Sequence, residues 1–264
     1  MLNNTLCPTF ILSSPGPIAF YIAMWPVRWY GIIIAVSFLI CYGLAERLIK
    51  KNNLDLNSFN DLIFLVLIFG IVFARLYFVS LNANYFKDHL SEIPQIWLGG
   101  QSIHGGILGA IFAVFVFCRI KRISFFKYID VFATVAPLGQ SLGRWGNFFN
   151  NEAFGKPVDE WLIKLKIPLE YRPSGFLHNE YFHPTFLYES VLDFMLFVFI
   201  YTKFAIWKDK PGKIFWSYLF GYSLIRFCVE FLRTDSLSLF GNVASAHIMS
   251  IIIIVVSSFF LIRR

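Results

Sequence analysis

Residues 62–81 read "LIFLVLIFGIVFARLYFVSL", and this stretch decides the class of fold. A helix of about 20 apolar residues is long enough to cross the hydrocarbon core of a bilayer. The stretch has this length and holds a single charged side chain, Arg75. The whole chain of 264 residues is 57% hydrophobic and 15% charged, whereas a soluble domain carries about 25% charged residues. The sequence therefore predicts an integral membrane protein.

Seven segments are apolar and long enough, or nearly so, to span a membrane. They are residues 28–46, 60–81, 102–118, 129–142, 185–203, 214–232 and 244–262. The predicted fold is an all-α polytopic membrane protein that forms one domain over residues 1–264. An apolar stretch at 17–27, broken at Pro26, is expected to be interfacial or re-entrant. The long connection at 143–184 is expected to be a small folded head.

The basic residues predict the orientation of these spans. The connections after the first, third and fifth spans, together with the C-terminus, hold 13 of the 23 lysines and arginines. By the positive-inside rule these segments face the cytoplasm, so the N-terminus and the head are expected outside. Orientation thus accounts for the net charge of +7, and no nucleic-acid partner is expected.

The cysteines show no spacing typical of a metal site or a redox pair. They are Cys7, Cys41, Cys118 and Cys228, and three of them lie in apolar runs. A free cysteine in such a run behaves as a small hydrophobic residue, so all four are expected to be structural.

Charged side chains inside spans are costly, about 2.5–3.5 kcal/mol each on insertion scales, and are functional candidates by default. In "GYSLIRFCVEFLR" (residues 221–233), Tyr222, Arg226 and Glu230 follow one another at four-residue spacing and share one helix face. Arg226 and Glu230 have two possible roles. They form an ion pair that lets the span insert into the membrane, or Glu230 orients the guanidinium group of Arg226 to bind an anion.

Two further motifs place polar groups near the predicted outer ends of spans. "GGQSIHGGILGA" (residues 99–110) surrounds His104 with glycines, and His104 is either a packing residue or a group that transfers protons. "HPTFLYES" (residues 183–190) opens the fifth span. Its Glu189, and Asp193 one turn later, are expected partners for the arginines.

"GRWGNFFNNEAFG" (residues 143–155) is the most polar of the motifs. Pro137 and Gly139 precede it and predict that the backbone leaves regular helix at 143–147. Irregular backbone at this depth must be buried in protein or line a cavity, so its asparagines are expected to satisfy backbone groups. Arg144 needs an anion, and with Arg226 it could clamp a phosphodiester at the level of lipid headgroups.

Together with "RWYG" (28–31), these motifs resemble the prolipoprotein diacylglyceryl transferases of the bacterial inner membrane. The resemblance implies that phosphatidylglycerol donates its diacylglyceryl group to the lipobox cysteine thiol of a prolipoprotein. A thioether forms and glycerol phosphate leaves. The implied partners are phosphatidylglycerol, prolipoprotein signal peptides and membrane lipid, and no metal or cofactor is implied. The active site would face the outer side of a multi-pass protein.

The resemblance also implies roles for particular residues. The implied catalytic residues are His104, Arg144, Tyr222 and Arg226. The implied substrate-binding residues are Tyr30, Arg144, Asn147, Glu152, Gly155, Arg226 and Glu230. Either His104 or Tyr222 would take the thiol proton, and the arginines would stabilise the leaving phosphate. Phe186 and His247 stand where the family commonly has glutamine.

Two other functions remain open from the residues alone. A lipid transporter or flippase would explain intramembrane charges, but it predicts internal repeats and a site near the midplane. Another phospholipid-using transferase, acting on phosphorus, would need paired acids for magnesium. Asp130 and the Glu189/Asp193 pair lie at opposite ends of their predicted spans and do not form such a cluster.

Overall fold

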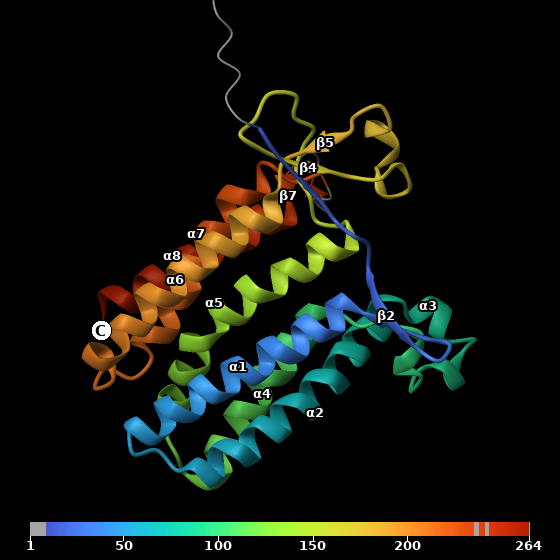
Figure 1. Cartoon of the computed structure of the whole chain (residues 1–264). Helices are drawn as coiled ribbons and strands as arrows, with labels where there is room; N and C mark the ends of the chain where they lie inside the picture. The colour runs from blue at the N-terminus through green and yellow to red at the C-terminus, as the bar shows by residue number, and fades with distance from the viewer. Residues whose placement is uncertain (1–8, 235–237, 241–242, 264) are drawn as a thin grey trace, which may run out of the picture. The chain divides into compact units, whose positions relative to one another are not determined.

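The computed structural model describes residues 9–234, 238–240 and 243–263 (Figure 1). The chain divides into two compact units. Unit 1 comprises Met1–Ala45 and Phe132–Arg264, and unit 2 comprises Glu46–Val131. Cys7, for which the sequence predicts a structural role, lies outside the described residues, and the other three cysteines are free.

The long helices follow the apolar segments. Their bounds are α1 (Trp29–Lys51), α2 (Leu56–Leu81), α4 (Ile103–Lys121), α5 (Phe125–Asn150), α6 (Thr185–Trp207), α7 (Lys213–Glu230) and α8 (Ser245–Ile262), and α3 is a single turn, Ala83–Phe86. Each of the seven predicted spans falls on one long helix, so the prediction of a helical polytopic protein is confirmed. Among the described helices, α1, α2, α4, α6 and α8 are apolar and long enough to cross a membrane. Helices α5 and α7 carry the polar motifs, which lower their hydropathy.

Helix α5 corrects one prediction. It runs without interruption from Phe125 to Asn150 and contains Pro137, so the expected break at 143–147 is wrong. A proline in a helix interior removes one hydrogen bond, but packing on either side can keep the flanking turns helical. Here the last turns pack against the start of α1, where Trp29 stacks on Phe149 with ring centroids 4.9 Å apart.

Short strands accompany the helices, and the sequence did not predict them. In unit 1, β1 (Phe10–Ser13) pairs in parallel with β4 (Ile163–Lys166), and β4 pairs antiparallel with β5 (Tyr181–Phe182). The stretch expected to be interfacial or re-entrant forms an antiparallel hairpin of β2 (Ile18–Ile22) and β3 (Trp25–Arg28). A second hairpin joins β6 (Ser238–Phe240) to β7 (Val243–Ala244) before α8.

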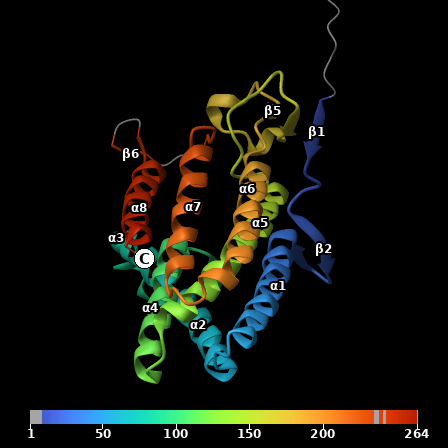
Figure 2. The same ribbon diagram turned by 90° about the vertical axis from the view of Figure 1, so that its left-hand side faces the viewer.

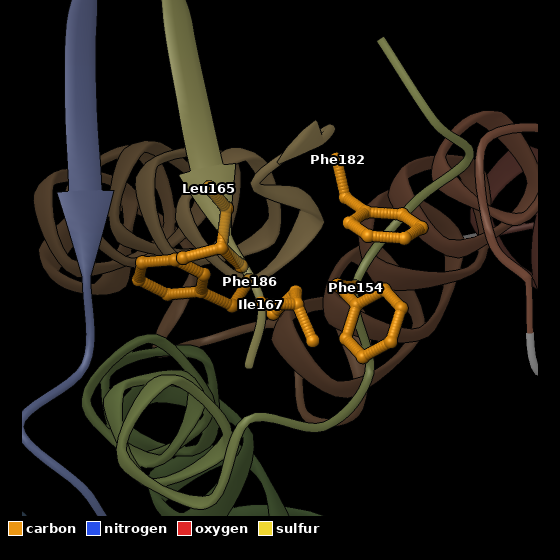
Figure 3. Packing of buried hydrophobic residues seen from close by; sticks show 5 residues of the cluster. All are labelled: Phe154, Leu165, Ile167, Phe182 and Phe186. Carbon is orange, nitrogen blue, oxygen red and sulfur yellow. The ribbon is translucent and has the colours of Figure 1, made fainter. Parts of the chain in front are cut away.

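The segment after α5 folds around its own hydrophobic core (Figure 3). The core residues are Phe154, Leu165, Ile167, Phe182 and Phe186. Burying an aromatic or aliphatic side chain of this kind contributes about 1.5–3 kcal/mol. Because Phe186 belongs to α6, the core fixes the first turn of that helix to the small sheet.

Three helices of unit 1 lie side by side, with α7 between α6 and α8 (Figure 2). Trp216 of α7 stacks on Phe260 of α8 with ring centroids 4.2 Å apart. Helix α5 meets α6 through a buried pair of serines. Ser141 Oγ donates to Ser190 O at 2.7 Å, and Ser190 Oγ donates to Ser141 O at 2.9 Å. These bonds fix the level at which α5 and α6 cross.

In unit 2, glycines allow α4 to approach α2 closely. A Cβ atom added at Gly105 or Gly109 would collide with the α2 backbone, at the carbonyl oxygens of Phe73 and Phe69 respectively. Small residues commonly serve this purpose between membrane helices. At Gly106, by contrast, an added Cβ atom would make an ordinary contact, 3.6 Å from Gly70 O.

We predict that Gly109→Ala destabilises the protein by about 1–3 kcal/mol, because the added methyl group forces α4 away from α2. Gly106→Ala is the matched control and is expected to change the free energy of unfolding by less than about 0.5 kcal/mol. Thermal unfolding of the two variants in the same detergent measures the difference. Equal melting temperatures would contradict the close-packed interface.

Candidate active site

Glu189, one turn into α6, binds arginines from two other helices of unit 1. Its side chain is 2% exposed. Arg144 of α5 places Nε 2.7 Å from Oε2, and Arg226 of α7 donates from Nη1 to Oε1 at 2.9 Å. Arg233, just beyond α7, lies 3.8 Å from Oε2. One buried carboxylate therefore joins three basic side chains.

Arg226 has a second carboxylate partner on its own helix. Its Nη2 lies 2.6 Å from Oε2 of Glu230, so the predicted pair at four-residue spacing exists. The side chains of Arg144 and Arg226 remain 19% and 21% exposed. A guanidinium group has five N–H donors, and these contacts occupy only some of them. The two arginines can therefore still bind an anion.

Tyr222 lies beside this group of charges. Its phenol is close enough to Arg144, Glu189 and Arg226 to interact electrostatically with each. Unit 1 thus brings together Arg144, Tyr222, Arg226 and Glu230, four of the residues that the sequence nominated. We call these four residues and Glu189 the arginine cluster.

The asparagines of the 143–155 motif act at the end of α5. Asn147 Nδ2 and Asn150 Nδ2 both donate to Glu152 Oε1, at 2.9 and 3.2 Å. The expectation that these two asparagines satisfy irregular backbone is wrong, because the backbone there is helical. Asn151 takes the left-handed conformation, with φ of 53°, and turns the chain out of the helix.

Gly155 lies where three backbone segments cross. Its N–H donates to His183 O at 2.9 Å, and it forms an isolated β-bridge with Arg233. A Cβ atom at this position would stand 2.7 Å from His183 Cβ and 2.9 Å from Leu232 O. Through these contacts Gly155 connects the motif to the residues that precede α6 and to those that follow α7. Only glycine fits at this position, because a Cβ atom would collide with both segments.

Tyr30, the second residue of α1, packs on the same motif. An added Cβ atom at Gly146 would lie 2.5 Å from its ring. The absence of a side chain at Gly146 lets the tyrosine ring lie against α5.

His104 belongs to unit 2 and is the second residue of α4. Its ring centroid lies 6.4 Å from that of Tyr77 on α2. The loop that leads to His104 is held by Arg75, whose charge the sequence had marked as a functional candidate. This buried guanidinium donates to four backbone carbonyls, those of Glu92, Ile93, Gly99 and Gly100, at 2.6–2.9 Å. Arg75 therefore fixes the entry to the helix that carries His104.

Another histidine, His183, lies just before α6. Its Nδ1 is 3.3 Å from the hydroxyl of Tyr188, which accepts a hydrogen bond from Trp161 Nε1 at 2.7 Å. Burial lowers the pKa of His183, which favours its neutral form. These contacts tie the connection between α5 and α6 to the first turn of α6. No group of His, Cys, Asp or Glu among the described residues is arranged to hold a metal ion.

The central position of Glu189 was not part of the predicted site. The sequence named it only as an expected partner for the arginines. A carboxylate one turn inside an apolar span, in a chain with several arginines at span ends, is the signal that could have identified it. That signal does not say which arginines it joins, because they come from different helices.

The fold and the arginine cluster define a class of protein: a multi-pass membrane protein in which buried carboxylates pair with partly exposed arginines. Residues 17–263 match the family described as prolipoprotein diacylglyceryl transferase. The chain belongs to that family, which confirms the resemblance found in the motifs, and it is a transferase.

Several similar proteins carry the name phosphatidylglycerol–prolipoprotein diacylglyceryl transferase. One from Staphylococcus epidermidis is 41% identical over 249 residues, which cover 94% of this chain and 88% of that protein. One from Nostoc sp. is 42% identical over 248 residues, covering 92% and 87%. One from Staphylococcus aureus is 41% identical over 250 residues, covering 94% and 88%.

We predict that Glu189→Gln destabilises the protein by about 3–5 kcal/mol, because it removes the charge that two partly buried arginines share. Glu180→Gln is the matched control. Glu180 pairs with Lys166 at 2.6 Å on an exposed surface, and its loss is expected to leave stability almost unchanged. Thermal unfolding in detergent compares the two variants. If both unfold at the temperature of the wild type, the arginine cluster does not depend on Glu189.

Proposed function

We propose that this transferase moves the diacylglyceryl group of phosphatidylglycerol to the lipobox cysteine thiol of prolipoproteins. The observation that carries the proposal is the pair of partly exposed arginines, Arg144 and Arg226, fixed side by side through Glu189. Planar guanidinium groups suit the two free oxygens of a phosphodiester and stay charged at any physiological pH. No metal or cofactor is required in this proposal.

The reaction replaces a carbon–oxygen bond with a carbon–sulfur bond. The cysteine thiol gives up its proton to a base, and the sulfur attacks the glycerol carbon that carries the phosphate. That carbon–oxygen bond breaks, and glycerol phosphate leaves with the electron pair. The charge that develops on the phosphate oxygens is stabilised by the two arginines. Holding the thiol and the lipid in line supplies much of the remaining acceleration.

The base is either His104 or Tyr222. Tyr222 lies within the arginine cluster, and His104 stands at the start of α4 on a loop fixed by Arg75. A thiol must become a thiolate to attack carbon, and a histidine is suited to accept its proton near neutral pH.

The remaining predicted site residues position the substrate in this proposal. Asn147 holds Glu152 at the end of α5, Gly155 fixes the chain beyond it, and Tyr30 packs on α5. Glu230 keeps Arg226 oriented toward the ligand. These contacts set the position of Arg144 and Arg226 relative to the lipid headgroup.

We also propose how the protein lies in the membrane. All seven long helices cross the bacterial inner membrane, with the N-terminus outside and the C-terminus in the cytoplasm. Residues 143–184 then form a head on the outer side of a single membrane domain. The arginine cluster, at the start of α6 and the end of α7, lies at the outer headgroup level.

The enzyme and a lipid flippase are distinguished by product. A flippase would move phosphatidylglycerol between leaflets unchanged, whereas the transferase forms a thioether on a peptide. The arginine cluster lies at helix ends, while transporter sites commonly lie at the midplane between repeats. This position favours the transferase.

We predict that Arg144→Ala lowers the rate of thioether formation by about 10²–10³-fold, because it removes a donor to the leaving phosphate. Purified protein receives phosphatidylglycerol and a peptide with a lipobox cysteine, and the thioether product is measured. Lys166→Ala, at an exposed lysine of the 143–184 segment, is the control and is expected to keep wild-type activity. No product from the wild type, or full activity of Arg144→Ala, would refute the proposed function.

The two candidate bases are separated by His104→Gln and Tyr222→Phe. Loss of a general base commonly costs about 10²–10⁴-fold in rate. We expect the larger loss in the variant that lacks the base, together with a flattened dependence of kcat on pH. If neither variant loses activity, the thiol proton goes to another group.

A further inference from the structure

Asp193, one turn beyond Glu189 on α6, is wholly buried, and no group in the described part of the chain donates a hydrogen bond to it. Its relative exposure is 0%. Among the described residues, neither of its carboxylate oxygens accepts a hydrogen bond. It is nevertheless close enough to Arg144, Glu189 and Arg226 to interact electrostatically with all three. It therefore lies beside the arginine cluster without taking part in its ion pairs.

One more buried acceptor without a hydrogen-bond donor, Gln140 Oε1, lies in the same region as Asp193. On α7, the phenols of Tyr218 and Tyr222 lie within electrostatic reach of its carboxylate. Gln140 of α5 is hydrogen-bonded to Tyr218, while its own Oε1 is buried and accepts no hydrogen bond in the described structure. Three oxygens, two from Asp193 and one from Gln140, thus lack donors in one region of unit 1.

Unsatisfied buried acceptors are rare because each costs about 1–3 kcal/mol, and more when the group is charged. Their position between helices is fixed, since Ser141 and Ser190 lock α5 to α6 at the level between Glu189 and Asp193. A ligand that satisfies these acceptors must bring hydrogen-bond donors. A second anionic group would not meet this requirement, but hydroxyl groups would.

We propose that Asp193, assisted by Gln140, accepts hydrogen bonds from the two hydroxyl groups of the glycerol headgroup of phosphatidylglycerol. The proposal rests on the proposed function, which places the phosphate of that lipid on Arg144 and Arg226. A carboxylate is the side chain that commonly accepts from neighbouring sugar hydroxyls, as in dinucleotide-binding folds. Asp193 is then the residue that selects the headgroup, while the arginines hold its phosphate.

The spacing along α6 is compatible with a phosphate bound near Glu189 and hydroxyl groups bound at Asp193. Glu189 and Asp193 are one helical turn apart, about 5.4 Å along the axis. The hydroxyls of the headgroup sit on the second and third carbons beyond the phosphate oxygen, a comparable length. In the proposed orientation Asp193 lies one turn nearer the bilayer centre than Glu189, so the bound lipid turns its glycerol headgroup inward from the phosphate to bring the hydroxyls to Asp193.

The test compares two lipids that differ only in the leaving group. Phosphatidylethanol carries the same single negative charge as phosphatidylglycerol and gives the same thioether product, but its headgroup has no hydroxyls. The wild type is expected to prefer phosphatidylglycerol by at least about tenfold in kcat/KM, because the analogue leaves buried acceptors unpaired. Asp193→Leu, which fills similar space without acceptors, is expected to lose most of this preference.

Two variants separate recognition from packing. Asp193→Asn keeps one acceptor oxygen and is expected to retain an intermediate preference. Ser190→Ala, at a buried neighbour that contacts Ser141 rather than the ligand, is expected to lower the rates with both lipids by the same factor. Because each result is a ratio of two rates measured on one preparation, a partly folded variant still gives a usable value.

Several outcomes would overturn the inference. One is a wild type that uses both lipids equally well. Another is an Asp193→Leu or Asp193→Asn variant in which both rates fall in parallel, which is the result of a structural role. Failure of the wild type to form any thioether would instead refute the proposed function, so the two failures are distinguishable.

Discussion

The pairing of Glu189 with arginines from α5 and α7 is the interaction on which the rest of unit 1 depends. Buried charged side chains are stable only when they are paired, and here one carboxylate pairs with two guanidinium groups. The pairing sets the separation of Arg144 and Arg226. The Ser141–Ser190 pair and the hydrophobic core that includes Phe186 then fix the position of α6 against its neighbours.

The helices could be predicted from the sequence because length and apolar composition are local properties. The course of α5 could not, because Pro137 predicts a break, whereas the end of the helix is stabilised by Trp29 and Tyr30, more than a hundred residues earlier. The strands were missed for a related reason. They are two to five residues long, and β1 pairs with β4 across about 150 positions of sequence.

In the candidate site, too, contacts within one helix could be predicted from the sequence, whereas contacts between helices could not. Arg226 and Glu230 could be paired from their spacing, because both lie on one helix. Glu189 could not be assigned to particular arginines, since no spacing rule connects residues on three helices. The sequence marked both Arg75 and Arg144 as costly charges and predicted a phosphate-binding role for Arg144 alone. In the structure Arg75 binds four backbone carbonyls, whereas Arg144 pairs with Glu189 and its side chain stays partly exposed.

The order of these charges along the chain has a consequence for biosynthesis. Domains and helices emerge from the ribosome N-terminal first. Arg144 arrives on α5, before Glu189 on the next long helix, and Arg226 arrives on α7 after Glu189 and four residues before Glu230. Each arginine of the cluster therefore reaches the translocon with a counter-charge on its own helix or on the one that follows. During synthesis, neither Arg144 nor Arg226 waits longer than one further long helix for a carboxylate partner.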